Sequence, residues 1–234
     1  MNKTVVAARV PSHLGIIVDG NRRWAREHGL SIAEGHRQGY LNLRAISEAA
    51  FTEGVEYVSA YVFSTENWNR SAEEVRDLMR LLLWVVRHEV ENLSKHGIRL
   101  RAVGNKVRLG KALVRSIHEA EEETKYNTRG TLLLCLDYGG QQEIVEAMKR
   151  IVADGTPADE ITPELIGSHL YAPDVPPVDL IIRTSGEQRL SNFQLWNSAY
   201  SELMFTDTYW PDFSKEELHD MLVAYSERNR RFGK

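Results

Sequence analysis

The chain has 234 residues, of which 42% are hydrophobic and 26% are charged, as is ordinary for a globular protein. Its net charge of −4 excludes a protein that binds nucleic acid through an overall basic surface, so any affinity for phosphate must come from locally gathered arginines. The single cysteine, Cys135, cannot form an internal disulfide and lies in an apolar run typical of a buried core position. The eight histidines lack the paired spacing of a zinc site.

Residues 1–10 contain only a short apolar patch, which is too short for a signal peptide. No stretch of the sequence approaches the ~20 apolar residues that span a bilayer. We therefore expect a flexible N-terminus over residues 1–10, a single folded domain over residues 11–234 and a cytoplasmic location.

The first predicted strand, Leu14–Val18, ends in a carboxylate, Asp19. Gly20 and Asn21 then turn the chain tightly, and two arginines and a tryptophan read as the first turn of a helix. A strand that turns directly into a helix presents free backbone N–H groups and the positive end of a helix dipole, which suits phosphate. An acid at the strand tip can hold Mg²⁺ over that phosphate. The simpler alternative is an ordinary turn with Asn21 as the N-cap.

Strand-like and helix-like segments alternate along the rest of the chain. The predicted strands are Leu14–Val18, Tyr57–Phe63, Ile98–Val103, Thr131–Leu136 and Val178–Ile182, with a weaker sixth at Leu203–Phe205. The predicted helices are Glu34–Glu53, Ala72–Lys95, Val107–Lys125, Gln141–Ala153, Pro163–Leu170 and Lys215–Asn229. Continuous apolar strands separated by helices predict a single α/β domain, with a mainly parallel six-stranded sheet flanked by helices.

The predicted helix Ala72–Lys95 is apolar over an unusually wide part of its circumference. Such a helix must bury two sides. One side packs on the core, and the other either meets a neighbouring helix or subunit or lines an elongated apolar cavity. Capping boxes at Ser71–Glu74 and Ser214–Glu217 predict where this helix and the last one begin.

Charged residues, amides and glycines follow four of the predicted strands at their carboxyl ends, where function collects in an open parallel sheet. These segments are Asp19–Arg23, Ser64–Arg70, Asp137–Gly140 and Arg183–Ser191. In the last segment, two arginines and a serine suit an anion because guanidinium groups match phosphate oxygens. The alternative is that Arg183 and Arg189 simply pair with Glu187. The coincidence of four such segments predicts one polar site at this edge of the sheet.

Motifs along nearly the whole chain resemble those of the cis-prenyltransferases, the undecaprenyl-diphosphate-synthase type of Z-isoprenyl transferase. The matching segments, in the family's order, are Asp19–Trp24, Gly35–His36, Phe63–Trp68 with Arg70, Tyr138–Gly140, Arg183–Ser191, Trp196, Glu202–Thr206, Trp210–Phe213 and Arg231–Gly233. The resemblance implies that residues 11–234 are a catalytic domain with an apolar tunnel. The sequence has no DDxxD run, so the chain cannot bind metal through the aspartate clusters that trans-prenyltransferases use.

The resemblance implies a prenyl transferase that adds isopentenyl diphosphate to an allylic diphosphate, farnesyl or geranyl, with Z geometry, releasing pyrophosphate. It implies Mg²⁺ as the cofactor, since a divalent cation and arginines stabilise the charge that grows on the leaving diphosphate. The expected product is a C50–C55 polyprenyl diphosphate of the undecaprenyl or decaprenyl type, a cell-wall lipid carrier.

The resemblance also assigns roles to individual residues. Asp19 and Asn67 are the catalytic residues, and Asp19 and Glu202 are the metal ligands. The substrate-binding residues are Gly20, Asn21, Arg22, Arg23, Trp24, His36, Ser64, Thr65, Glu66, Trp68, Arg70, Arg183, Arg189 and Ser191. Of these, the last three form the isopentenyl diphosphate site, and residues 20–23 with His36 and Arg70 bind the allylic diphosphate. The tryptophans, as large aromatic residues, favour packing over chemistry.

The chain departs from the family pattern near three of these positions. No basic residue stands a few positions before Gly35, Arg22 replaces a glycine of many long-chain bacterial members, and Val62 has intermediate bulk where larger side chains are associated with shorter products. A short or medium product, such as C15 or C35, is therefore an alternative.

Two alternatives belong to other functional classes. A non-catalytic partner subunit of a heteromeric prenyltransferase typically lacks the aspartate of the first motif, whereas Asp19 is present. A magnesium phosphohydrolase would require a second acid or nucleophile near Asp19, and none stands out in the sequence. The resemblance further implies a homodimer in which Arg231–Gly233 reaches toward the partner's active site. It implies no nucleic-acid partner, and peripheral membrane contact for product release.

Overall fold

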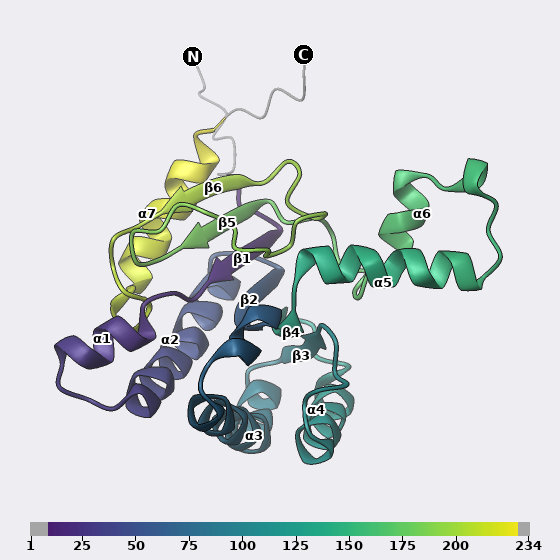
Figure 1. Ribbon diagram of the computed structural model, residues 1–234. Coiled ribbons are helices and arrows are strands. Elements are labelled where there is room, and N and C mark those ends of the chain that lie inside the picture. Colours follow the sequence, from purple (N-terminus) through teal and green to yellow (C-terminus); the bar gives the residue numbers. More distant parts are fainter. Residues whose placement is uncertain (1–8, 229–234) are drawn as a thin grey trace, which may run out of the picture.

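The computed structural model describes residues 9–228, and a six-stranded sheet lies at its centre (Figure 1). The strands are β1 (His13–Ile17), β2 (Tyr57–Ser64), β3 (Ile98–Val103), β4 (Gly130–Tyr138), β5 (Leu180–Arg183) and β6 (Glu202–Phe205). All neighbours pair in parallel, in the order β3-β4-β2-β1-β5-β6. The predicted α/β domain is therefore confirmed, and the weakly indicated sixth strand is a true edge strand.

Within residues 9–228, helices lie between successive strands except between β5 and β6, which an irregular segment connects. The helices are α1 (Asn21–Glu27), α2 (Ile32–Thr52), α3 (Ala72–Lys95), α4 (Lys111–Thr124), α5 (Gly140–Ala153), α6 (Pro163–Ser168) and α7 (Lys215–Ser226), with short 3₁₀ segments η1 (Thr65–Asn69), η2 (Ala158–Glu160) and η3 (Trp210–Asp212). The bounds predicted for Ala72–Lys95 are those of α3. None of the helices in the described part of the chain is both long and apolar enough to cross a membrane.

The sheet separates two apolar layers because successive strand residues point to opposite faces. Leu14 and Ile16 of β1 point into the larger layer, which lies beneath α2, α3, α4 and α7. Ile17 points into the smaller layer, which is closed largely by Phe193 and the irregular segment before it. Cys135 is buried in this second layer, and its burial raises the pKa of its thiol, which agrees with a packing role rather than a nucleophile.

The broad apolar surface of α3 is buried on more than one side, against α2, α4 and β3. Two small apolar cavities, of about 60 and 50 Å³, remain between α2, α3 and the sheet. Both are lined by Tyr40, Leu43, Val62, Leu82 and Val85. Because ligand pockets typically have ~300–1,000 Å³, the structure has a closed apolar seam at the position expected for the tunnel.

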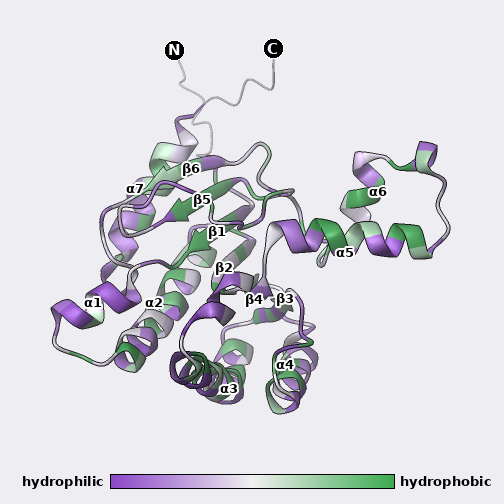
Figure 2. Cartoon of the chain, in the orientation of Figure 1, coloured by the Kyte–Doolittle hydropathy of each residue, from purple (hydrophilic) through white to green (hydrophobic). Residues whose placement is uncertain are grey.

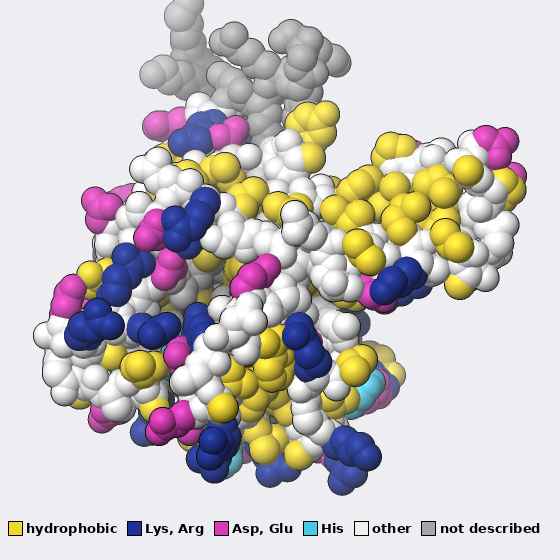
Figure 3. All heavy atoms as spheres, viewed as in Figure 1, with side chains coloured by type: hydrophobic (Ala, Val, Ile, Leu, Met, Phe, Trp, Pro, Cys, Tyr) yellow, Lys and Arg dark blue, Asp and Glu magenta, His cyan; other side chains and the backbone are white. Residues whose placement is uncertain are grey.

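The helices α5 and α6 form an arm, residues 140–170, that projects from the body of the molecule (Figure 1). Val145 and Val152 are seven residues apart on one face of α5 and are 46% and 68% exposed. Apolar stretches run along both helices in Figure 2, and hydrophobic side chains gather over the arm in Figure 3. An exposed apolar patch of this kind marks an interaction surface.

Candidate active site

Asp19 lies just beyond the carboxyl end of β1, where the chain turns into α1. Gly20 is the N-cap of α1 with φ +111°, and a Cβ at this position would lie 2.9 Å from Oγ of Ser185. The Asp19 carbonyl accepts hydrogen bonds from Oγ1 of Thr184 (2.7 Å) and from the backbone N–H of Trp210 (3.0 Å). The turn therefore requires glycine, and Gly20, not Asn21, occupies the N-cap.

Two glycines of α2 allow this helix to pack closely against the start of α1. A Cβ at Gly35 would lie 2.4 Å from the backbone oxygen of Asn21, and a Cβ at Gly39 would lie 2.2 Å from its Oδ1. Neither contact leaves room for a side chain. The close approach brings His36, which follows Gly35, beside the turn at Asp19.

The hollow around Asp19, which we call the Asp19 cleft, has two adjoining parts. The smaller part, about 300 Å³, is lined by Arg22, Arg23, Arg26, Arg70 and His36 together with residues 18–21. The larger part, about 570 Å³, includes Tyr61, Ser64, Glu66, Asn67, Arg183, Ser191 and Asn192 in its lining. Arg70 lines both parts, the smaller part adds Arg22, Arg23 and Arg26, and the larger part adds Arg183. Asp19 also belongs to both parts, so its carboxylate lies between Arg183 and the arginines of the smaller part. Guanidinium groups gathered in this way suit a multiply charged phosphate ligand.

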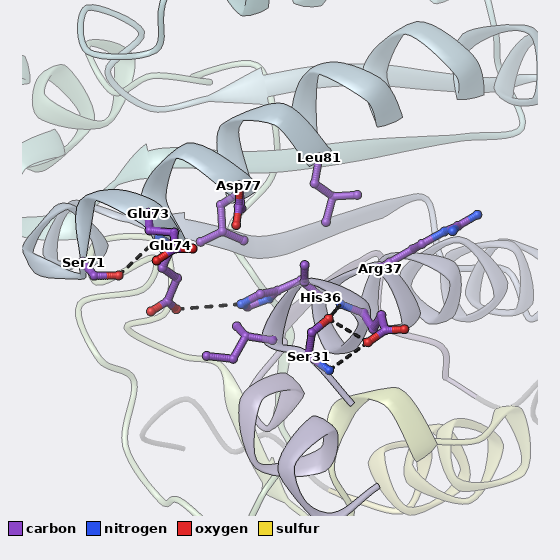
Figure 4. Close-up of a pocket in the computed structure, with 12 residues that line it drawn as sticks. Ser31, His36, Arg37, Ser71, Glu73, Glu74, Asp77 and Leu81 are labelled. Carbon is purple, nitrogen blue, oxygen red and sulfur yellow. Dashed lines mark hydrogen bonds and ion pairs between the residues drawn. The ribbon is translucent and has the colours of Figure 1, made fainter. Parts of the chain in front are cut away.

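Three side chains of the smaller part, those of Arg70, Arg22 and His36, share one carboxylate, that of Glu74 on the first turn of α3. Oε1 of Glu74 lies 3.0 Å from Arg70, 3.7 Å from Arg22 and 3.9 Å from His36. Figure 4 shows the pair formed by Glu74 and His36. Burial, followed by the positive charges of Arg70 and Arg22, lowers the pKa of His36 to about 4. His36 is therefore a neutral imidazole at neutral pH.

Arg183, at the carboxyl end of β5, joins the two sides of the larger part. Its Nη2 donates to Oδ2 of Asp19 (2.8 Å), and its Nη1 donates to Oγ of Ser191 (2.7 Å) and to the carbonyl of Arg189 (2.5 Å). Arg23 lies 3.3 Å from the other carboxylate oxygen of Asp19. Both oxygens of Asp19 are thus oriented by guanidinium groups.

The segment that follows β5 adopts a costly backbone conformation. Ser185, Ser191, Asn192 and Gln194 have positive φ angles of 81°, 49°, 67° and 47°. Each such non-glycine residue costs on the order of 1 kcal/mol, and such residues cluster at ligand sites. The strain indicates that this loop is held for function.

Two buried nitrogens of the cleft, Nε2 of His36 and Nε of Arg183, have no hydrogen-bond partner. Buried polar atoms are nearly always hydrogen bonded. Donors and acceptors left open in a cationic cleft are therefore groups that a ligand would satisfy.

The segment η1 carries Asn67 and Glu66 into the cleft. Oδ1 of Asn67 accepts a hydrogen bond from the backbone N–H of Ser64 (3.1 Å), which fixes its amide. Nδ2 of Asn192 donates to Glu66 (3.0 Å) across the cleft. This bond ties η1 to the strained loop.

Trp68 anchors the far end of η1 to the sheet. Its Nε1 donates to Oδ1 of Asp137 (2.7 Å), and Nε of Arg108 donates to Oδ2 of the same carboxylate (3.0 Å). Asp137 is fully buried, so it supports the cleft from beneath. It lies at the carboxyl end of β4, the predicted edge of the sheet, but its side chain is buried and does not line the cleft.

Most of the predicted site residues meet in the cleft. The structure brings together Asp19, Gly20, Asn21, Arg22, Arg23, His36, Ser64, Glu66, Asn67, Arg70, Arg183 and Ser191. The cleft lining does not include Trp24, which donates to Asp212, or Thr65 and Trp68, which pack beneath it. The Arg189 side chain is 59% exposed and pairs with Glu187, as the alternative interpretation of that segment held.

Glu202 does not join Asp19 within one chain. It begins β6 and is paired in register with Leu180, so it lies at the amino end of the sheet, and Asp19 lies beyond the carboxyl end of β1. Its carboxylate pairs with Arg228 (2.5 Å). The prediction that Asp19 and Glu202 share a metal is therefore wrong for a single chain. The predicted contact of Arg231–Gly233 with a partner lies outside the described residues.

Asp19 on its own fits a metal shared with a phosphate ligand. In residues 9–228, no cluster of three or more His, Cys, Asp or Glu side chains is arranged to hold an ion. Mg²⁺, however, is commonly held by one or two carboxylates together with substrate phosphates and water. A single carboxylate beside a cationic cleft meets that requirement.

Sequence reasoning missed three residues that contribute to the cleft. Arg26 lies one turn after Arg22, so the i, i+4 spacing was the available signal. Asn192 and Glu74 have no such signal, because each acts through partners that lie far away in the sequence.

Comparisons with known proteins identify the same family that the sequence motifs resemble. Residues 17–233 match the family model described as undecaprenyl diphosphate synthase. The chain is 46% identical over 228 residues to a trans,polycis-polyprenyl diphosphate synthase, (2Z,6E)-farnesyl diphosphate specific, from Thermobifida fusca, covering 96% of this chain and 81% of that protein. It is 46% identical over 231 residues to a decaprenyl diphosphate synthase from Mycobacterium bovis, covering 97% and 78% of the two chains.

A solved structure agrees with these sequence relatives. Lavandulyl diphosphate synthase from Lavandula x intermedia, in complex with dimethylallyl diphosphate, superimposes with a TM-score of 0.92 at 37% identity, over 96% of this chain and 99% of that one. With a family match over nearly its whole length, the chain belongs to the cis-prenyltransferases of the undecaprenyl diphosphate synthase family.

Proposed function

We propose that the protein is a magnesium-dependent cis-prenyltransferase that condenses isopentenyl diphosphate with farnesyl or geranyl diphosphate to a Z-polyprenyl diphosphate, releasing pyrophosphate. The observation that carries this proposal is the position of Asp19 in one cleft between Arg183 and the arginines of the smaller part. A reaction between two diphosphate esters needs two adjacent anion sites. The reaction also needs groups that stabilise the negative charge on the diphosphate that leaves.

The smaller part of the cleft is the allylic site in this proposal. Arg22, Arg23, Arg70 and His36 bind the diphosphate that leaves, and Arg26 adds a further positive charge. These groups are in position before the reaction, so they stabilise the negative charge that develops as the allylic C–O bond breaks. Mg²⁺ bound by Asp19 and the diphosphate would supply a Lewis acid for the same charge.

The larger part is the isopentenyl diphosphate site. The Arg183 guanidinium and the Ser191 hydroxyl, which are hydrogen bonded to each other, bind the phosphates of isopentenyl diphosphate. Arg189 binds the same phosphates after its guanidinium leaves Glu187. Asn67 also lines the larger part, and we place it beside the carbons that react. Its amide, which is fixed by the Ser64 backbone, orients the group that loses a proton.

The growing chain enters the apolar seam between α2 and α3. The seam begins beside His36 and continues over Val62 to Leu82 and Val85, so it starts where the allylic diphosphate is bound. Its small cavities require α3 to move outward as the chain grows. A C50–C55 product is the principal assignment, with a short or medium product as the alternative. The presence of Asp19 and Arg183 argues against a non-catalytic partner subunit.

The product of the purified protein tests the proposed function. Incubation with Mg²⁺, labelled isopentenyl diphosphate and geranyl or farnesyl diphosphate should yield labelled prenyl diphosphates, and their length on thin-layer chromatography assigns the product class. Chelation of the metal should stop the reaction. The absence of any product from either starter would contradict the proposal.

We further propose that the protein is a homodimer that contacts a membrane only peripherally, with the exposed face of α5 in the subunit interface. Val152→Asp should shift the molar mass measured by light scattering from dimer to monomer, because a charge in an apolar interface is costly. Val107→Asp is the matched control, since Val107 is 89% exposed and lies off the arm. A wild-type mass equal to one chain, or a dimer that survives Val152→Asp, would contradict this use of the arm.

A further inference from the structure

Glu74 occupies a place among the cations of the proposed allylic site. Its side chain is 10% exposed, and its Oε1 lies within 3.0 to 3.9 Å of Arg70, Arg22 and His36. These groups come from α1, from α2 and from the loop before α3. In Figure 4 the Glu74 side chain extends from α3 toward His36 on α2. A carboxylate thus stands where the proposed function requires a diphosphate.

The position of Glu74 leaves the cap of α3 half formed. Oγ of Ser71 accepts a hydrogen bond from the Glu74 backbone N–H (3.2 Å), but the Glu74 carboxylate does not return to the Ser71 backbone N–H. In the capping box Ser31–Glu34 the return bond is present at 2.8 Å, and in Ser214–Glu217 it is present at 3.1 Å. Glu74 therefore has a second set of partners available, and it is bonded to the cations instead.

A carboxylate and a diphosphate cannot both hold these cations at low cost. The two anions repel each other, and the diphosphate carries the larger charge, so its arrival favours departure of Glu74. The Ser71 N–H offers the departing carboxylate a hydrogen-bond donor at the positive end of α3. The exchange would leave each group with a partner.

We propose that Glu74 is an internal counter-ion of the allylic site, which holds Arg22 and Arg70 in the free enzyme and moves to the Ser71 amide when a diphosphate binds. The inference rests on the proposed function of the cleft. While the site is empty, the carboxylate offsets the repulsion between the two guanidinium groups. During turnover it competes with bound pyrophosphate and so assists its release.

Binding of inorganic diphosphate to the Glu74→Gln variant tests the competition. Glutamine keeps the length of the side chain and can complete the cap, but it carries no charge. Calorimetric titration at fixed Mg²⁺ should give a Kd about tenfold below that of the wild type, as expected when one partly buried competing charge is removed. Glu73→Gln is the matched control, because it removes an equal charge from an exposed position on the same turn of α3, and its Kd should stay within about twofold of the wild type.

Hydrogen exchange at the Ser71 amide tests the movement. Protection of this amide should rise on addition of inorganic diphosphate in the wild type, and it should not rise in Glu74→Ala, which cannot form the cap. A Glu74→Gln affinity no tighter than that of Glu73→Gln would overturn the competition, and unchanged Ser71 protection in the wild type would overturn the movement. Failure of the wild type to bind inorganic diphosphate at all would overturn the assignment of the cleft as well.

Discussion

Replacing Asp19 with alanine is expected to lower kcat by about 10³-fold while the chain remains folded. The carboxylate lies between Arg183 and Arg23, and under the proposed function its loss would remove the protein's contact to the metal that offsets charge on the leaving diphosphate. Preorganised electrostatic contacts of this kind contribute ~3–4 kcal/mol to transition-state stabilisation. Steady-state kinetics over a Mg²⁺ titration, with thermal unfolding to check the fold, would measure the effect.

Asp19 also orients Arg183 and Arg23, and Asp19→Asn separates this role from metal binding. Asparagine retains an oxygen that accepts a hydrogen bond from Arg183 but loses the charge that attracts a cation. If the metal role is correct, the asparagine variant should be about as impaired as the alanine variant, and added Mg²⁺ should restore little. Near-normal turnover in the asparagine variant would leave the orientation of Arg183 as the whole function of Asp19.

Replacing Arg183 with lysine is expected to reduce kcat/KM for isopentenyl diphosphate by about 10²-fold. An ammonium group cannot span Asp19, Ser191 and the Arg189 carbonyl together, as the guanidinium does. The loss of one or two charged hydrogen bonds costs ~1.5–3 kcal/mol each. Initial rates with each substrate varied in turn would locate the defect.

Arg189→Lys provides the control for this prediction. The Arg189 side chain is exposed and pairs only with Glu187 in the described structure. Replacing Arg189 should therefore raise the KM for isopentenyl diphosphate less than replacing Arg183 does. Equal defects in the two variants would mean that Arg189 closes fully onto the substrate. If only the apparent affinity for the allylic substrate changed, the assignment of the two sites would be reversed.

The fold was largely predictable because its signals are local. Apolar runs such as Ile98–Val103 are strands with the predicted bounds, and the capping signal at Ser71 marks the start of α3 correctly. The short helix α1 was only partly predicted. Its seven residues carry little apolar periodicity, and packing against Gly35 and Gly39 positions it.

Site residues that directly follow the carboxyl end of a strand were predicted. Site residues that act through partners far away in the sequence were missed. The capping pattern predicts that the Glu74 carboxylate bonds to Ser71. In the structure, Arg22 of α1 and Arg70 of the loop before α3 compete for this carboxylate, and the sequence cannot show that competition. Glu202 is the opposite case. It is the first residue of its strand, and in a parallel sheet that position alone separates it from Asp19, which follows the end of β1.

Asn192 forms hydrogen bonds with both the arm and the cleft. Its backbone oxygen accepts from Gly140 N–H (2.7 Å) and its Oδ1 accepts from Gln141 N–H (2.8 Å), while its Nδ2 donates to Glu66 in the cleft (3.0 Å). The first turn of α5 is therefore bonded to the wall of the cleft through the backbone and side chain of one residue. Linkage is reciprocal, so if docking on the arm changes the affinity of the cleft for a substrate, the substrate changes the affinity of docking by the same factor.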